Sequence, residues 1–187
     1  WSEGELPITD LEYRDPLCEA FIKGAVEEGI PRNKDYNGQF QEGVSYVQRT
    51  TQGRFRVSAA KAFLNPVKSR KNLTIITNAF VSKVIIENKT ATGVEFLKGG
   101  IRGKKIILKA NKEVILSSGV IKSPHLLQLS GIGPGKYLKE VGIDVIHDLK
   151  GVGMNLRDHF APRLTARAKN VETINEKSRG LKLLTEI

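Results

Sequence analysis

The pattern of hydrophobic and polar positions changes its period along the chain. Residues 15–29 place apolar side chains at helical spacing behind an Asp-Pro pair, which predicts a helix that ends at a glycine. Residues 44–51 alternate and are rich in Val, Tyr and Thr, so we expect a strand there. Residues 58–64 predict a short helix that ends before the next proline. The first part of the chain is therefore expected to be mixed helix and strand.

The middle of the chain is a run of predicted strands. Residues 73–77 and 80–86 come first, and an Asn-Lys turn leads back through residues 91–97. A tip rich in lysine and glycine precedes a further strand at 105–109. Residues 113–117 are a short apolar run of the kind found in buried strands. The spacing predicts an antiparallel meander that leads into a more buried strand.

The stretch 113–135 has a distinctive order of residue types. The small residues at 118–119 break the apolar run, and Ser123 with Pro124 predicts the start of a helix, since proline suits the first helical position. Gly131 ends that helix. A strand, a small-residue turn and a helix in this order can direct backbone N–H groups at an anionic cofactor.

The end of the chain has weaker patterns. Residues 136–141 predict a second short helix, and residues 144–147 predict a short strand. Residues 151–159 form a glycine-hinged turn that carries polar side chains. Residues 181–187 predict an interrupted helix.

Composition narrows the class of protein. The chain has 187 residues, of which 40% are hydrophobic and 27% charged, as in an ordinary globular chain of one or two domains. No apolar run approaches the roughly 18 residues of a membrane span, and no secretory signal is visible. The single Cys18 excludes an internal disulfide and a cysteine-built metal site. A first residue of Trp indicates a chain cut from a longer one.

The net charge of +10 raises the alternative of a basic module that binds nucleic acid or another anionic polymer. Its densest basic region runs from Lys98 to Lys105. No aromatic residues interleave with this region, and no nucleic-acid-binding motif appears. A lysine- and glycine-rich hairpin tip explains the region better, because a turn needs glycine and exposed lysine keeps it soluble.

The candidate catalytic and phosphate-binding patterns are incomplete. Gly131, Gly133 and Gly135 follow a predicted helix rather than a strand, so we interpret them as a helix end and loop and not as a dinucleotide fingerprint. The three histidines are not spaced as helical metal ligands, and no metal site is predicted. GxSxG is absent, which leaves Ser117 and Ser118 as small residues beside which a bulky group could approach the backbone.

Several blocks together resemble a known family. Residues 117–135, SSGVIKSPHLLQLSGIGPG, resemble the second signature of the glucose–methanol–choline (GMC) oxidoreductases. Residues 91–95 and 56–64 resemble two further family blocks in the right order. Residues 151–159 are similar to the family's GVGxNLQDH, with Arg157 where glutamine is usual. The resemblance covers nearly the whole chain.

The resemblance implies an enzyme that oxidises an alcohol, choline-like or another primary alcohol, by hydride transfer to FAD. It also implies an α/β fold with an α+β part, in which a Rossmann-like FAD domain is interleaved with an antiparallel-sheet substrate domain. We expect residues 1–71 to belong mostly to the substrate domain and connecting segments. Residues 72–135 would form FAD-domain strands, hairpin and signature helix, and residues 136–187 would form an edge of the FAD domain that returns to an incomplete substrate domain. The implied location is cytoplasmic, and the electron acceptor and any membrane association of the full-length enzyme stay open.

The family's N-terminal GxGxxG, its first signature and its C-terminal histidine block are absent from this sequence. We therefore expect an internal piece of a GMC enzyme that is inactive alone, contains no catalytic residue and does not use His159 as the base. The resemblance still implies residues near FAD. These are Val81, Ser117, Ser118 and Gly119, and more weakly Asn155, Asp158 and His159.

Overall fold

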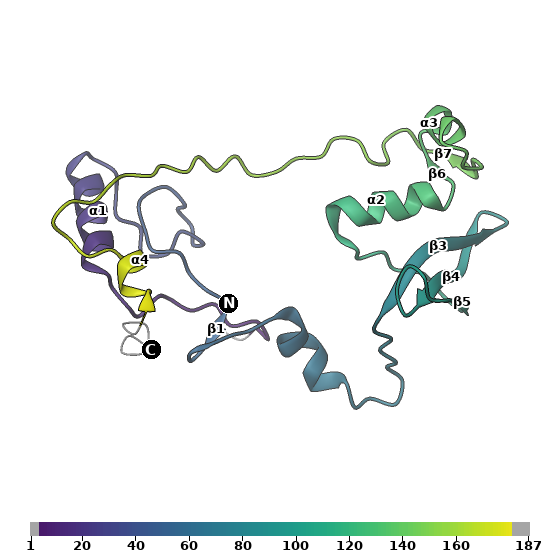
Figure 1. Ribbon diagram of the computed structural model, residues 1–187, viewed down its shortest axis with the longest axis horizontal. Coiled ribbons are helices and arrows are strands. Elements are labelled where there is room, and N and C mark those ends of the chain that lie inside the picture. The colour runs from purple at the N-terminus through teal and green to yellow at the C-terminus, as the bar shows by residue number, and fades with distance from the viewer. Residues whose placement is uncertain (1–3, 181–187) are drawn as a thin grey trace. The chain divides into compact units, whose positions relative to one another are not determined.

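The computed structural model describes residues 4–180, and the chain divides into two compact units (Figure 1). The first unit contains residues 1–74 and 163–187, and the second contains residues 75–162. The predicted three-part division of the chain stays a prediction. No helix within residues 4–180 has both the length and the hydropathy needed to cross a membrane.

The first unit is built on α1 (Pro16–Glu27), which confirms the predicted helix. Asp15 begins it, because its carboxylate accepts a hydrogen bond from the Leu17 N–H at 2.9 Å, and Pro16 fills the first helical position. Ile22 is buried. The other elements are the hairpin β1 (Thr51–Gln52) and β2 (Phe55–Arg56), the π-helical turn η1 (Ala60–Leu64), the 3₁₀ turn η2 (Asn65–Val67), and α4 (Ile174–Lys177).

One prediction in this unit is wrong, one is confirmed, and one helix was missed. Residues 44–51 do not form the predicted strand, because only isolated bridges at Val44 and Arg49 and the two residues of β1 find partners. The short helix predicted to end before Pro66 is confirmed as η1, which ends at Leu64, and the separate 3₁₀ turn η2 then begins at Asn65. The sequence reasoning missed α4, although Thr173 and Glu176 form a capping box at its start. The helix predicted at 181–187 lies outside the described residues.

The second unit contains the predicted meander, which is confirmed as a three-stranded antiparallel sheet. Its strands are β3 (Ala79–Glu87), β4 (Thr90–Lys98) and β5 (Lys104–Lys109), in that spatial order. Asn88 and Lys89 both have positive φ, 50° and 63°, so they make the two-residue turn whose twist matches antiparallel strands. Val84 and Phe96 are buried, each 4% exposed.

The other two strands predicted near the meander are absent. Residues 73–77 contain no strand and are mostly exposed, since they find no neighbouring strand in the described part of the chain. Residues 113–117 are also not a strand. Val114 and Leu116 are half-buried, whereas Ile115 is 76% exposed, so one face of this segment is covered and the other is open. An apolar run needs a strand partner for its backbone groups, and within residues 4–180 the sheet offers it none.

The signature helix α2 (Gly119–Leu129) begins earlier than predicted, and Pro124 lies inside it. Ser123 accepts a hydrogen bond from the Ser118 N–H at 3.1 Å, which supports the first turn where Pro124 cannot donate. The unit is completed by β6 (Ile132–Gly133), the predicted second helix α3 (Gly135–Glu140), and β7 (His147–Asp148). β7 pairs in parallel with β6 and lies later than the predicted strand at 144–147.

At this level the predicted α/β class with an antiparallel part is confirmed, and the core of the second unit lies where α2 packs on β3 (Figure 1). Buried side chains from the sheet, from α2 and from the elements after it make this core. They are Val84, Phe96, Leu126, Leu138 and Val152.

Candidate functional site

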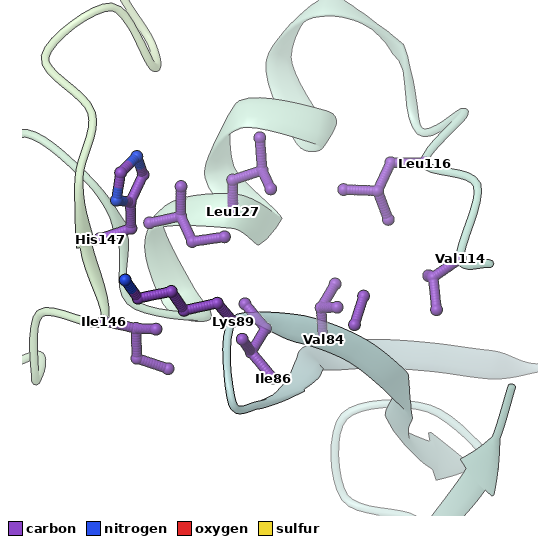
Figure 2. A pocket seen from close by; sticks show the side chains of 10 residues that line it. Val84, Ile86, Lys89, Val114, Leu116, Leu127, Ile146 and His147 are labelled. Atoms are coloured by element: carbon purple, nitrogen blue, oxygen red, sulfur yellow. The ribbon is translucent and has the colours of Figure 1, made fainter. Parts of the chain in front are cut away.

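An apolar cavity of about 360 Å³ lies in the second unit between β3, α2 and residues 114–116 (Figure 2). Val84 and Ile86 line it from the sheet, and Leu127 lines it from the helix. Lys89 and His147 also line the cavity, and their nitrogen atoms are visible on the left of Figure 2. Two of the residues that line the cavity, Val84 and Leu116, are close in sequence to the predicted FAD-contacting segments, Val81 and residues 117–119.

Val81 lies on β3, three residues before the cavity-lining Val84, and is 38% exposed. It pairs with Phe96 of β4, and the register shifts between Val81 and Lys83 as in a β-bulge. β3 is the edge of the sheet, so half of its backbone groups point away from β4. The backbone around Val81 is therefore open to another molecule or segment on one side.

Residues 117–119 follow directly after the cavity-lining Leu116 and enter α2. Ser117, Ser118 and Gly119 are all exposed. A Cβ atom added to Gly119 would meet nothing within 4 Å, so the space beside this backbone is open. Val81 and residues 117–119 are therefore close in sequence to residues that line the cavity, Val84 and Leu116, but do not line it themselves. Their predicted role beside FAD stays a prediction.

Asn155 is brought to the other side of α2. It lines a second hollow, of about 530 Å³, which is bounded by residues 120–128 of α2 and by the loop 151–157. Gln128 holds this loop, since its side-chain amide nitrogen donates to the Val152 carbonyl at 3.3 Å. A Cβ atom on Gly153 would lie 2.8 Å from that nitrogen, which is the movable end of the Gln128 side chain, so the φ of +80° is the main reason that glycine is favoured at this position.

Asp158 and His159 are not brought to either hollow. Their side chains are 97% and 101% exposed, and the His159 Nδ1 lies 3.9 Å from the Asp158 carboxylate. The Asp158 carboxylate also accepts the His159 backbone N–H at 2.8 Å. This contact joins two neighbouring residues and builds no enclosed site within the described residues.

Sequence reasoning missed two residues that organise this region, Gln128 and Ser130. Ser130 is fully buried, and its hydroxyl bonds to both α2 and β3. Gly131 next to it has φ of +82°, and a Cβ atom there would lie 2.5 Å from the Asp144 carbonyl. Gly131 is thus confirmed as the end of the helix, whereas the loop predicted after it is wrong, because Gly133 lies in β6 and Gly135 begins α3. A polar residue on the apolar side of a helix end was the signal that could have found Ser130.

The sheet contains an ion pair between Glu95 and Lys105. Glu95 on β4 accepts from Lys105 at 3.0 Å and from the Ser82 hydroxyl at 2.8 Å. Lys105, followed by Ser82, holds the pKa of Glu95 below its ordinary value. Among residues 4–180, no three His, Cys, Asp or Glu side chains come together as a metal site.

Comparison with known proteins identifies the class. The family model described as GMC oxidoreductase matches residues 1–161, so the chain belongs to the GMC oxidoreductase family. Members of this family use FAD. The resemblance seen in the sequence is thereby confirmed.

Curated relatives of known name cover most of this chain. An oxygen-dependent choline dehydrogenase of Rhizobium rhizogenes is 47% identical over 159 residues, which are 85% of this chain and 28% of that protein. An alcohol dehydrogenase [acceptor] of Pseudomonas putida is 41% identical over 169 residues, 90% of this chain and 30% of that protein. The chain thus spans less than a third of the length of these relatives.

Solved structures agree with the fold. An FAD-dependent oxidoreductase from Chaetomium thermophilum superposes with a TM-score of 0.78 at 35% identity, over 83% of this chain and 27% of that one. Pyridoxine 4-oxidase from Mesorbium loti gives a TM-score of 0.72 at 33% identity, over 79% of this chain and 28% of that one.

Proposed function

We propose that this chain is part of an FAD-dependent enzyme that oxidises an alcohol, choline-like or another primary alcohol, to an aldehyde. The carrying observation is the family match over residues 1–161, which includes the signature block 117–135. The names of the choline dehydrogenase and alcohol dehydrogenase relatives support the substrate class. We also propose that segments of an FAD domain and of a substrate domain alternate along the chain.

Within this enzyme, the chain would supply one wall of the FAD site. Val81, at the open edge of β3, and the exposed backbone of residues 117–119 would lie against the cofactor. The residues present fit such a group, because the space beside Gly119 is open and the neighbouring side chains are small. Asn155, beside α2, would form a further part, with a weaker contribution from Asp158 and His159.

When bound, FAD would accept the hydride that leaves the carbon of the alcohol. This chain's residues would bind and orient the cofactor, and we assign none of them as the base that takes the hydroxyl proton. His159 is fully exposed beside Asp158, without the enclosure that orients a general base.

The basic-module alternative gains no support from the sheet. Lys105 is engaged with Glu95, and the Lys98 Nζ donates to the Thr77 carbonyl at 2.9 Å. Both lysines carry out roles within the hairpin. We therefore retain the flavoenzyme as the proposed function.

The test begins with the full-length protein that carries this chain. We expect it to keep a flavin spectrum through gel filtration and to be bleached anaerobically by choline or a simple primary alcohol. We expect the 187 residues alone to keep no FAD. A colourless full-length protein that does not bind added FAD would overturn the proposal.

A substitution tests the wall directly. Ser118→Leu adds bulk to an exposed residue whose side chain makes no capping hydrogen bond, so we expect little loss of stability but weaker FAD retention. Ser69→Leu is the matched control, since Ser69 is also exposed and lies outside the proposed wall. Equal FAD retention in the two variants would contradict the placement of the cofactor beside Ser118.

A further inference from the structure

We propose that Ser130 is a positioning residue whose hydroxyl fixes the spacing between Val81 and residues 117–119. The inference rests on the proposed function, because these are the segments assigned to FAD. It goes beyond that function by naming a residue that acts through others, without contacting the cofactor.

The Ser130 hydroxyl both accepts and donates a hydrogen bond. Its side chain is fully buried, it accepts the Val84 N–H at 2.8 Å, and it donates to the Leu126 carbonyl at 2.6 Å. The first bond reaches β3, forty-six residues away in sequence, and the second remains within α2. One side chain therefore ties the end of the helix to the edge of the sheet.

The bond to Val84 replaces a missing strand neighbour. β3 pairs only with β4 in the three-stranded sheet, so a Val84 N–H that points to Ser130 has no strand to bond on that side. The register shift between Val81 and Lys83 loosens the pairing just before this point. Val84 is thus the anchored position from which the chain runs back through the bulge to Val81.

The helix α2 connects the anchored Ser130 with residues 117–119 at its other end. α2 runs from Gly119 to Leu129, a rigid element of about 16 Å at 1.5 Å per residue, and Ser130 follows its last turn. Fixing Ser130 on β3 therefore fixes where residues 117–119 lie relative to the strand. The turn beyond cannot relax easily, because Gly131 is packed against the Asp144 carbonyl.

Other residue types would not replace this group. Alanine would leave the buried Val84 N–H without a partner, and cysteine, with nearly the same shape, is a weak hydrogen bonder.

Amide hydrogen exchange in the full-length protein tests the clamp, by which we mean the hydrogen bonds of Ser130 to Val84 and Leu126. We expect exchange in the β3 peptide that contains Val84 to accelerate about tenfold or more in Ser130→Ala. Unchanged exchange would overturn the clamp whether or not FAD binds.

FAD affinity of the full-length apoprotein tests the positioning role. We expect Ser130→Ala to raise the Kd for FAD about tenfold and to change the visible circular dichroism of the bound flavin. Leu138→Ala removes a fully buried core side chain in the same unit and so controls for lost stability. Ser178→Ala removes an exposed serine hydroxyl that bonds a nearby carbonyl, and serves as the neutral control.

The outcomes are distinct. A weaker Kd in Ser130→Ala with a normal Kd in both controls supports the proposal. Equal weakening in Ser130→Ala and Leu138→Ala reduces Ser130 to a stability role and overturns it. If Ser130→Ala does not fold, Ser130→Cys decides, since wild-type affinity in that variant contradicts the need for the hydroxyl. A wild-type protein that binds no FAD refutes the proposed function and this positioning role, while the exchange result still judges the clamp.

Discussion

Individual residues in the second unit are constrained by close backbone approaches that their type alone does not reveal. Gly131 and Gly142 are both glycines after a helix, with φ of +82° and +76°. A Cβ atom at Gly131 would strike the Asp144 carbonyl, whereas a Cβ atom at Gly142 would enter open space. Gly142 is therefore constrained only by its positive φ, whereas Gly131 is constrained by its positive φ and by the nearby Asp144 carbonyl.

Substituting these glycines separates the two constraints. We expect Gly142→Ala to cost about 1 kcal/mol of unfolding free energy from backbone strain alone, and Gly131→Ala to cost about 3 kcal/mol because overpacking is added. Denaturant unfolding of the two variants measures the difference. Equal losses would show that the turn at Gly131 opens to accept the methyl group.

In the first unit, Asp15 combines a helix cap with an ion pair. It is 2% exposed, it caps α1, and its carboxylate lies 3.4 Å from the Lys177 Nζ. Burial alone raises the pKa of Asp15, but hydrogen bonds from the Leu17 N–H and from the side chains of Tyr13 and Lys177 outweigh it and lower that pKa. The lowered pKa couples the stability of this unit to pH.

The pH dependence has a definite sign. Because the pKa of Asp15 is lower folded than unfolded, its ionised form stabilises the fold above the ordinary pKa near 3.8, and this is lost as pH falls through the folded value. Asp15→Asn keeps a good helix cap, so we expect it to unfold at lower denaturant than wild type at pH 7, and we expect this difference to shrink as the pH falls below 3.8.

The control for this comparison is Glu27→Gln. Glu27 pairs with Lys23 at 3.8 Å on the surface of α1, where both side chains are exposed, so no measurable change is expected. A gap between Asp15→Asn and wild type that stays constant down to pH 3 would assign the effect to the cap rather than to the charge.

At the scale of elements, the hydrophobic pattern correctly predicted the strands of the meander but wrongly predicted a strand at residues 113–117. β3, β4 and β5 are joined by short turns, so each strand finds its neighbour along the chain. Residues 113–117 also contain an apolar run, yet they form no strand with any segment in the described part of the chain. Local pairing could be predicted because the turn residues specify it.

The packing of the meander can be tested at Phe96 of β4. Phe96 is 4% exposed, so Phe96→Ala is expected to cost about 3–5 kcal/mol in unfolding free energy. Ile107 of β5 is 57% exposed, and Ile107→Ala is expected to change stability by about 0.5 kcal/mol or less. Thermal or denaturant unfolding compares the two, and similar small losses would mean that the Phe96 face is not a core.

For the whole molecule, we consider the second of the two places where the chain passes between the units. Residues 154–169 contain no helix or strand and are almost entirely exposed. The unit boundary at 162–163 lies within it. A segment with few backbone hydrogen bonds and little burial opens to solvent and proteases more readily than the elements on either side.

Limited trypsin digestion of the 187-residue chain tests this division. We expect the first cuts after arginines of this stretch, Arg157, Arg163 or Arg167, as read by intact-mass spectrometry. Lys104 and Lys105 are the internal comparison, since both are exposed but lie in the hydrogen-bonded strand β5. First cleavage within the meander would contradict the boundary.

The sequence by itself determined the family, the helix capped by Asp15 and the antiparallel meander, because motifs, caps and two-residue turns act between residues close in the chain. The tertiary structure decided the rest. It left residues 113–117 unpaired, started α2 at Gly119 with Pro124 inside it, and joined Ser130 to Val84 across the core. Contacts between distant segments decided these points, and no pattern within a single segment specifies which distant group it will meet.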